Sequence, residues 1–175
     1  MAFQPSLESG MKHRVYWITK RITQGQFATP ERAAVLRDQG VTHVLNVGEC
    51  GSIIDASDFG FAGIVDVPII DLQLIPNDVA LRAMDALQEM LTAPNSIAYI
   101  HCIAGQNRSP TILWLYFVAC GVLPDEASDL IGNRSPDAVP GHGRLIDAAL
   151  VANAKSHGES NYVPLSDQSV LEPAY

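Results

Sequence analysis

The chain carries little positive charge for its size. Its 11 lysine and arginine residues are outnumbered by 19 aspartate and glutamate residues, which gives a formal net charge of −8. A protein that follows a nucleic-acid backbone or lies on an anionic membrane needs a surplus of basic residues on its surface. We therefore expect neither a nucleic acid nor a membrane among its partners.

Long apolar runs and paired cysteines are also missing. The longest apolar run, from Thr111 to Leu123, is shorter than the roughly 20 residues that span a bilayer, and no basic segment followed by an apolar one opens the sequence. The three cysteines, Cys50, Cys102 and Cys120, form no paired framework, which favours a reducing compartment. We expect a cytoplasmic protein.

What is present fits one globular unit. The length of 175 residues and the 47% share of hydrophobic residues are enough to bury a core. We expect a monomeric single domain over residues 1–175, with its core at about 14–156 and a polar tail at 159–175. The histidines show no spacing typical of metal ligands, so we expect neither a metal nor another cofactor.

Apolar periodicity and turn residues predict alternating strands and helices. Short runs rich in β-branched residues predict strands at residues 15–18, 21–23, 41–47, 64–70 and 96–100. Helical spacing and capping residues predict helices at 30–36, from 77 to Pro94, at 111–120, from 124, and from 145 to Gly158, while residues 48–62 predict a loop. This alternation predicts an α/β fold in which helices flank a central, mixed and largely parallel sheet.

The segment from His101 to Ser109 lies between a predicted strand and a predicted apolar helix, and its residue types fit phosphate capture. A tight turn that points successive backbone N–H groups inward forms an anion-binding nest, and Gly105 permits that turn. Arg108, at the start of the helix, has a planar guanidinium that can bind two phosphate oxygens at once. The same positive surroundings favour the thiolate of Cys102, which is the nucleophilic form of cysteine.

The neighbours of these residues have predicted roles as well. Ser109 can donate a hydrogen bond to the sulfur when the sulfur is the leaving group, and His101 can support the loop from behind. The alternative interpretation, a buried structural cysteine in an ordinary turn, does not explain Arg108, Gly105 and Ser109 together. The loop residues predicted to surround a bound phosphate are Ile103, Ala104, Gly105, Gln106, Asn107 and Arg108.

The pattern His101-Cys102-x5-Arg108-Ser109 resembles the signature loop of the cysteine-dependent protein tyrosine phosphatase superfamily. The layout of the chain resembles the compact dual-specificity branch, and the likeness covers about residues 14–154, including the segment from Asn133 to 136. The resemblance implies a protein tyrosine phosphatase-like sandwich. It also implies hydrolysis of phosphotyrosine, phosphoserine or phosphothreonine in proteins, through a phosphocysteine intermediate and without a metal.

The resemblance further implies a general acid, an aspartate about thirty residues before the cysteine that protonates the leaving oxygen. Asp71 lies about thirty positions before Cys102, between a predicted strand and the helix that begins at 77, and it is our candidate. Asp66 and Asp78 are its rivals. Asp66 falls within the strand, and Asp78 falls within the first helical turn, where the helix dipole favours a carboxylate.

Other functions stay open at the level of sequence. Related cysteine phosphatases act on phosphoinositides, nucleotides or RNA 5′-phosphates, and a pseudophosphatase binds phosphate without turnover. The absence of basic residues from Ile103 to Asn107 disfavours polyanionic substrates, and the presence of both Cys102 and Arg108 disfavours a pseudophosphatase. A rhodanese-like sulfur carrier also uses a loop cysteine, but its loop usually differs in length.

Two residues outside the loop carry open hypotheses. Cys50 follows a predicted strand that could end near the loop, so an oxidative disulfide with Cys102 is one hypothesis. Asn46 lies inside an apolar strand. Its side chain could support the loop through a hydrogen bond, or it could satisfy local backbone groups instead.

Overall fold

The computed structural model describes residues 14–162 and 170–174. Five strands form one sheet in the order β1-β2-β5-β3-β4, in which only β1 and β2 pair antiparallel. The strands are β1 (Val15–Trp17), β2 (Ile22–Gly25), β3 (His43–Asn46), β4 (Gly63–Asp66) and β5 (Ala98–His101). The helices are α2 (Pro30–Asp38), α3 (Ala56–Phe59), α4 (Asn77–Thr92), α5 (Arg108–Ala119), α6 (Pro124–Gly132) and α7 (Ala148–Asn161).

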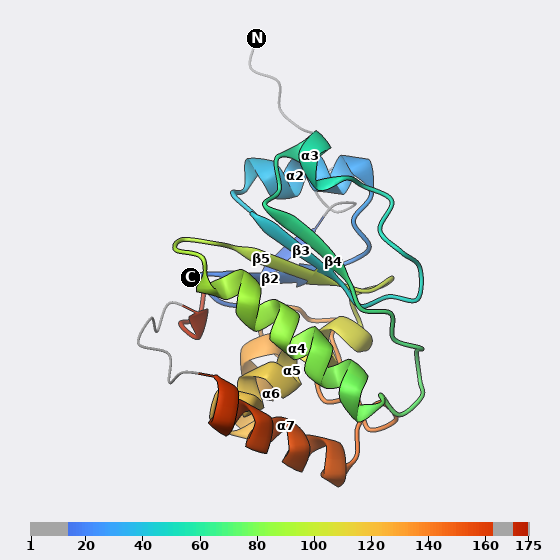
Figure 1. The fold of residues 1–175 in the computed structure, drawn as a ribbon, viewed down its shortest axis with the longest axis vertical. Helices are drawn as coiled ribbons and strands as arrows, with labels where there is room; N and C mark the ends of the chain where they lie inside the picture. Colours follow the sequence, from blue (N-terminus) through green and yellow to red (C-terminus); the bar gives the residue numbers. More distant parts are fainter. Residues whose placement is uncertain (1–13, 163–169, 175) are drawn as a thin grey trace.

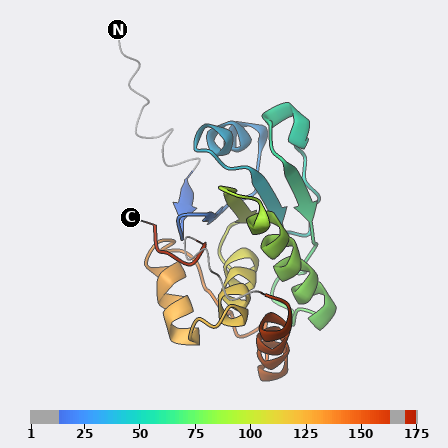
Figure 2. The ribbon, with the colours of Figure 1, turned by 60° about the vertical axis from the view of Figure 1, so that its left-hand side comes forward.

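Helices cover both faces of the sheet (Figures 1 and 2). Helices α2 and α3 lie on one face, and α4, α5, α6 and α7 lie on the other. Because successive strand residues point to opposite faces, Val44 and Tyr99 join the smaller core under α2 while Leu45 and Ile100 join the larger core. The predicted α/β fold with a mixed, largely parallel sheet is confirmed.

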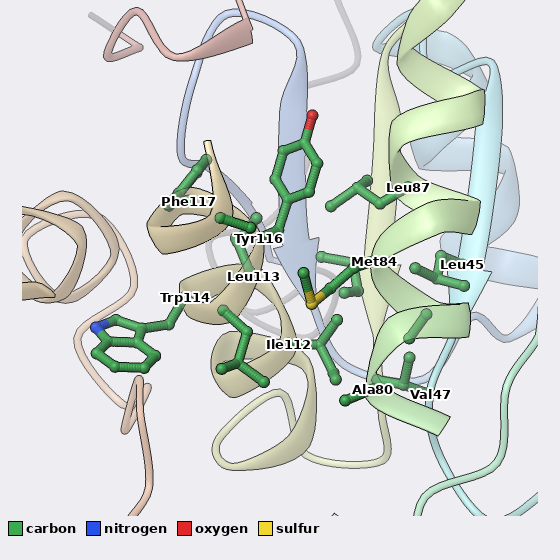
Figure 3. Close-up of a cluster of buried hydrophobic side chains, with 14 of the residues drawn as sticks. Leu45, Val47, Ala80, Met84, Leu87, Ile112, Leu113, Trp114, Tyr116 and Phe117 are labelled. Atoms are coloured by element: carbon green, nitrogen blue, oxygen red, sulfur yellow. The ribbon is translucent and has the colours of Figure 1, made fainter. Parts of the chain in front are cut away.

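The larger core is built around α5, which packs against α4, α6 and α7. Helix α5 is buried all round, as its unbroken apolar sequence predicts, and α4 buries one face. Figure 3 shows Met84 and Leu87 of α4 beside Ile112 and Tyr116 of α5. None of the helices within the described residues is long and apolar enough to cross a membrane.

The sheet brings three strand ends to one level. His101, the last residue of the central strand β5, pairs in register with Gly25 of β2 on one side and with Asn46 of β3 on the other. The loop that follows His101 therefore leaves the sheet at the edge where β2 and β3 also end. Parallel sheets place functional residues at this carboxyl edge.

Two predictions for the segments around β4 are wrong. The predicted strand at 64–70 is shorter, because β4 ends at Asp66 and Pro68, two residues later, has no N–H to continue the ladder. The predicted loop at 48–62 contains the one-turn helix α3, which ends at Gly60 with a positive φ of 73°. A single turn is too short to produce a detectable period in the sequence.

The last helix also differs from the prediction at both ends. It begins at Ala148, where Asp147 accepts a hydrogen bond from the N–H of Leu150, so Leu145 is buried in the preceding loop. It does not end at Gly158. A Cβ on Gly158 would lie 2.1 Å from the carbonyl oxygen of Ala119, so this glycine serves the close approach of α7 to α5.

The predicted polar tail at 159–175 is partly wrong. Residues 159–161 belong to α7, and Val170 is buried in the larger core. The backbone of Glu172 accepts a hydrogen bond from Lys20, and that of Ala174 donates one to Ile18, so residues 170–174 pack against the turn between β1 and β2. Residues 163–169 and 175 lie outside the described residues.

Candidate active site

The loop from Cys102 to Asn107 connects the end of β5 to the start of α5. Cys102 is 1% exposed, and its sulfur lies 3.4 Å from the hydroxyl oxygen of Ser109. Helix α5 begins at Arg108, as predicted, so its positive end is directed toward the loop. The loop that begins at Cys102 therefore leads into the N-terminus of a helix, which is the arrangement of an anion-binding site.

Three carbonyl groups of this loop bond outward. The carbonyl of Ile103 accepts from the N–H of Phe27 at 3.0 Å, that of Gly105 from the amide of Gln24 at 3.3 Å, and that of Gln106 from the N–H of Val139 at 2.7 Å. In a planar trans peptide the N–H points opposite to the carbonyl, so the N–H groups of the three following residues point inward. Those donors, which bond to no other described residue, belong to Ala104, Gln106 and Asn107.

Gly105 is required at its position for two reasons. Its φ is +72°, a conformation that other residues rarely adopt. A Cβ there would also lie 2.7 Å from the carbonyl carbon and oxygen of Gly25 on β2. The role predicted for this glycine, to permit the tight turn, fits both observations.

Arg108 closes the loop and is almost fully buried. One terminal nitrogen donates to the carbonyl of Ile69 at 3.0 Å, and the other lies 3.8 Å from the carboxylate of Asp71. Its Nε is buried without a hydrogen-bond partner among the described residues. An unpaired buried donor is costly, which fits a side chain that takes an oxyanion as its partner.

Asp71 is the carboxylate that the fold brings to this loop. Its two oxygens each lie 3.3 Å from the side-chain amide of Asn107, and its own N–H donates to Glu49 at 3.1 Å. The side chain of Asp71 is 35% exposed, so it borders solvent on one side and the loop on the other. A carboxyl group in this position can exchange a proton with a bound phosphate ester.

The two rival aspartates are placed elsewhere. The carboxylate of Asp66 accepts hydrogen bonds from Asn46 at 2.9 Å and from the hydroxyl of Ser52 at 2.6 Å, so it ties the loop after β3 to β4. Asp78 lies exposed in the first turn of α4. Among the three candidates, Asp71 is the one with contacts to the loop.

A buried glutamine that sequence reasoning missed supports the loop. Gln24 on β2 is fully buried, and its amide nitrogen donates to the carbonyl of Gly105 and to the hydroxyl of Ser135. Because a carbonyl can only accept, the amide oxygen of Gln24 must face Ser109, whose hydroxyl donates to it at 3.1 Å. A polar side chain inside a short buried strand is the signal that could have found it.

His101 lies directly behind the loop. It is fully buried between the rings of Phe27 and Tyr99, and its Nδ1 donates to the carbonyl of Cys102 at 2.9 Å. Burial lowers the pKa of His101 to about 4. The imidazole is therefore neutral at pH 7, with one proton fixed on Nδ1, and this contact fits the predicted support of the loop.

Asn46 supports a different segment from the one predicted. Its side chain donates to the carbonyl of Cys50 at 2.7 Å and to Asp66, and it accepts from the N–H of Gly48 at 2.9 Å. It therefore satisfies local backbone groups, which was the alternative hypothesis. Cys50 is exposed and Cys102 is buried, and both thiols are free, so the oxidative pair stays a prediction.

A polar pocket of about 230 Å³ lies beside the loop. The predicted substrate residues Ala104 and Gln106 line it, together with side chains from β1 and the loop after α6, among them Arg14, Tyr16 and Asp137. Cys102, Arg108 and Asp71 are not among the residues that line this pocket. Within residues 14–162 and 170–174, no cluster of three histidine, cysteine or acidic side chains could hold a metal ion.

Comparison with known proteins agrees with this geometry at the level of fold. No protein-family model matches the chain. The active form of Tk-PTP superposes with a TM-score of 0.63 at 16% identity, over 84% of this chain and 97% of that one. PTPMT1 in complex with PI(5)P gives 0.65 at 16% identity, over 83% and 95%.

Human DUSP28 gives a TM-score of 0.64 at 16% identity, over 83% of this chain and 97% of that one. The matched share of each solved chain is nearly complete, so the likeness covers the whole fold and not one motif. The resemblance expected from the sequence pattern is thus borne out in three dimensions. This chain has the compact α/β fold of the dual-specificity and tyrosine phosphatases.

Proposed function

We propose that this chain hydrolyses phosphate monoesters through a phosphocysteine on Cys102, with phosphorylated tyrosine, serine or threonine of cytoplasmic proteins as the substrate. The observation that carries the proposal is the convergence of Asp71 on the Cys102–Arg108 loop. A segment far away in the sequence thereby brings a carboxyl group to the loop that carries the guanidinium and the thiol.

In the first step the thiolate of Cys102 attacks phosphorus and the bond from phosphorus to the ester oxygen breaks. Asp71 gives its proton to that oxygen, so the alcohol or phenol leaves neutral. Arg108 and the inward N–H groups of the loop hold the three remaining oxygens. The transition state spreads negative charge over these oxygens, and stabilising this charge is the main contribution that a protein makes to phosphoryl transfer.

In the second step water attacks the phosphocysteine, and Asp71, now a carboxylate, takes a proton from that water. The bond from sulfur to phosphorus breaks, and phosphate leaves with the oxygen of the water. The hydroxyl of Ser109, 3.4 Å from the sulfur, donates a hydrogen bond to the departing thiolate. Both protein groups return to their starting forms.

The charge distribution supports a protein substrate over a polyphosphorylated one. No lysine or arginine occurs between Arg37 and Arg82, a range that contains the whole segment from β4 to α4 with the candidate acid Asp71. None occurs from Ile103 to Asn107 either. A substrate with further phosphates would need cations at these positions. A phosphorylated side chain carries one phosphate group and needs a single phosphate-binding site.

The test is turnover of para-nitrophenyl phosphate. The wild-type chain should release para-nitrophenol, and Cys102→Ser should release none, because a serine hydroxyl is not ionised at neutral pH. Cys50→Ser, the same change at an exposed cysteine, is the control and should keep wild-type turnover. Equal turnover by Cys102→Ser and the wild type would refute the proposal.

A further inference from the structure

Large apolar side chains surround the candidate site at the surface. Eight of them are exposed among the described residues, and four of these eight lie in the loop, bond to it, or are next in sequence to a residue that contacts it. We call these four the apolar rim: Ile70, Leu72, Ile103 and Val139, which are 58%, 40%, 43% and 46% exposed. Exposed apolar side chains gathered around one position are typical of a binding surface.

The rim contacts the loop at its start, its middle and its end. Ile103 follows Cys102 directly, and Val139 donates its N–H to the carbonyl of Gln106. Ile70 and Leu72 lie on either side of Asp71, whose carboxylate is within 3.3 Å of the amide of Asn107. These contacts place the four rim residues on segments that border the loop.

Leu72 is held in a conformation that leucine rarely adopts. Its φ is +57°, in the left-handed region, and its N–H donates to the carboxylate of Asp71 at 2.9 Å. Strained backbone of this kind is retained where the surrounding structure requires it, most often at functional sites. Here the strain presents an exposed leucine beside the candidate acid.

The charges near the rim are mostly negative. Glu49 accepts the N–H of Asp71, and both carboxylates border the rim. Arg14 lines the polar pocket beside Gln106, but Asp137 lines that pocket too. An acidic residue next to the substrate phosphate would meet these carboxylates, whereas an apolar residue would bury surface against the rim.

From these observations we infer that the apolar rim binds apolar residues on either side of the phosphorylated residue of a peptide. This inference rests on the proposed phosphatase function and names its substrate class. The net charge of −8 favours a peptide over a lipid phosphate, because an anionic bilayer repels an acidic protein. The site then selects phosphopeptides with leucine or similar residues next to the phosphate and rejects acidic ones.

Binding to the Cys102→Ser chain tests the inference independently of turnover. Three fluorescent phosphotyrosine peptides would differ only in the residues before and after the phosphotyrosine, which are leucine, serine or glutamate. We expect the leucine peptide to bind at least about tenfold more tightly than the glutamate peptide. Equal affinities, no measurable binding of any peptide, or tighter binding of the glutamate peptide would overturn the inference.

A second substitution locates the preference. Adding Leu72→Asn to the Cys102→Ser chain should reduce the preference for leucine over serine several-fold, and asparagine tolerates the left-handed conformation, so the loop keeps its shape. Ile70→Gln, at another exposed rim position, should act in the same direction. Leu123→Asn, at an exposed leucine directly before α6, is the matched control and should leave the preference unchanged.

Two further measurements separate the possible failures. Vesicles of phosphatidylcholine with phosphatidylinositol phosphate would bind more tightly than any peptide if the rim served a lipid, and that result would overturn the inference. Release of para-nitrophenol by the wild-type chain tests the phosphatase function alone. A chain that turns over the aryl phosphate but shows no peptide preference keeps the proposed function and loses this inference.

Discussion

At the scale of single residues, Gln24 connects more of the site than any residue of the loop itself. One buried amide bonds the hydroxyl of Ser109, the carbonyl of Gly105 and the hydroxyl of Ser135, which come from three different segments. Such networks are rigid when every member is paired and costly when one member is removed. Gln24 thus fixes the loop and the hydroxyl that faces the sulfur of Cys102.

We expect Gln24→Met, which has a similar shape, to lower the free energy of unfolding by roughly 2–4 kcal/mol, because it leaves buried polar groups without partners. Urea unfolding measures the change. Gln73→Met, at an exposed glutamine, is the control and should change stability by less than about 0.5 kcal/mol. A similar small effect at Gln24 would contradict its structural role.

His101 gives a prediction for pH. Its pKa is about 4 in the folded chain and about 6.5 when unfolded, so between these values the unfolded state alone binds the proton. The contribution of the neutral imidazole to the free energy of unfolding is therefore fully present above pH 6.5. It is lost as the pH falls toward 4, and the total loss is about 3 kcal/mol. Urea unfolding of the wild type and of His101→Asn at pH 7, 6 and 5 measures this effect. The free energy of unfolding should fall more steeply with falling pH in the wild type, and an equal fall in both chains would contradict the prediction.

Asp71 gives a prediction for catalysis at the same scale. As the general acid, it must be protonated in the first step, so activity falls on the alkaline side as the carboxyl group loses its proton. We expect Asp71→Ala to lower kcat by about 10²- to 10⁴-fold and to flatten that alkaline limb. The pH profile of para-nitrophenyl phosphate turnover measures both effects, and Asp78→Ala is the matched control on a rival aspartate.

At the scale of elements, the position of α7 depends on one missing side chain. Gly158 lies within a helix, where alanine would normally add up to about 1 kcal/mol of stability. Here a Cβ would meet the carbonyl oxygen of Ala119 at 2.1 Å, so α7 would have to move away from α5. The packing contact therefore outweighs the helix propensity at this position.

We expect Gly158→Ala to destabilise the chain by roughly 1–3 kcal/mol, as other overpacking changes do. Gly132→Ala in α6 should have no effect or a small stabilising effect, because nothing lies within 4 Å of its added Cβ. The thermal unfolding midpoint should thus fall for Gly158→Ala and stay unchanged or rise slightly for Gly132→Ala. A stabilised Gly158→Ala variant would show that α7 is not held at this distance.

At the scale of the whole molecule, the last described residues return to the first strands. Val170 is 1% exposed within the larger core, and residues 172 and 174 bond to the turn between β1 and β2. We expect Val170→Ala to lower the free energy of unfolding by about 2 kcal/mol, through lost burial and a remaining cavity. Leu123→Ala, at an exposed leucine, is the comparison in the same urea experiment and should have little effect.

The sequence by itself determined the elements and the loop. Capping residues and apolar spacing along nine to sixteen neighbouring residues identified α2, α4 and α5, and the residue types from Cys102 to Arg108 predicted an anion site. These features follow from interactions between residues that are close along the chain, so a linear pattern contains them. The predicted ends at Ile70 and Gly158 were wrong, because Pro68 cannot continue the strand ladder and because the close approach of α7 to α5 requires Gly158 inside the helix.

Only the tertiary structure decided which distant groups join the loop. The sequence favoured Asp71 over Asp66 and Asp78 by its position, and the path of the chain after β4 is what brings Asp71, among these three, to Asn107 and Arg108. The same holds for Gln24, which lies far from Ser109 in the sequence and 3.1 Å from it in space. Such contacts depend on how the sheet and helices pack together, and no local pattern records that packing.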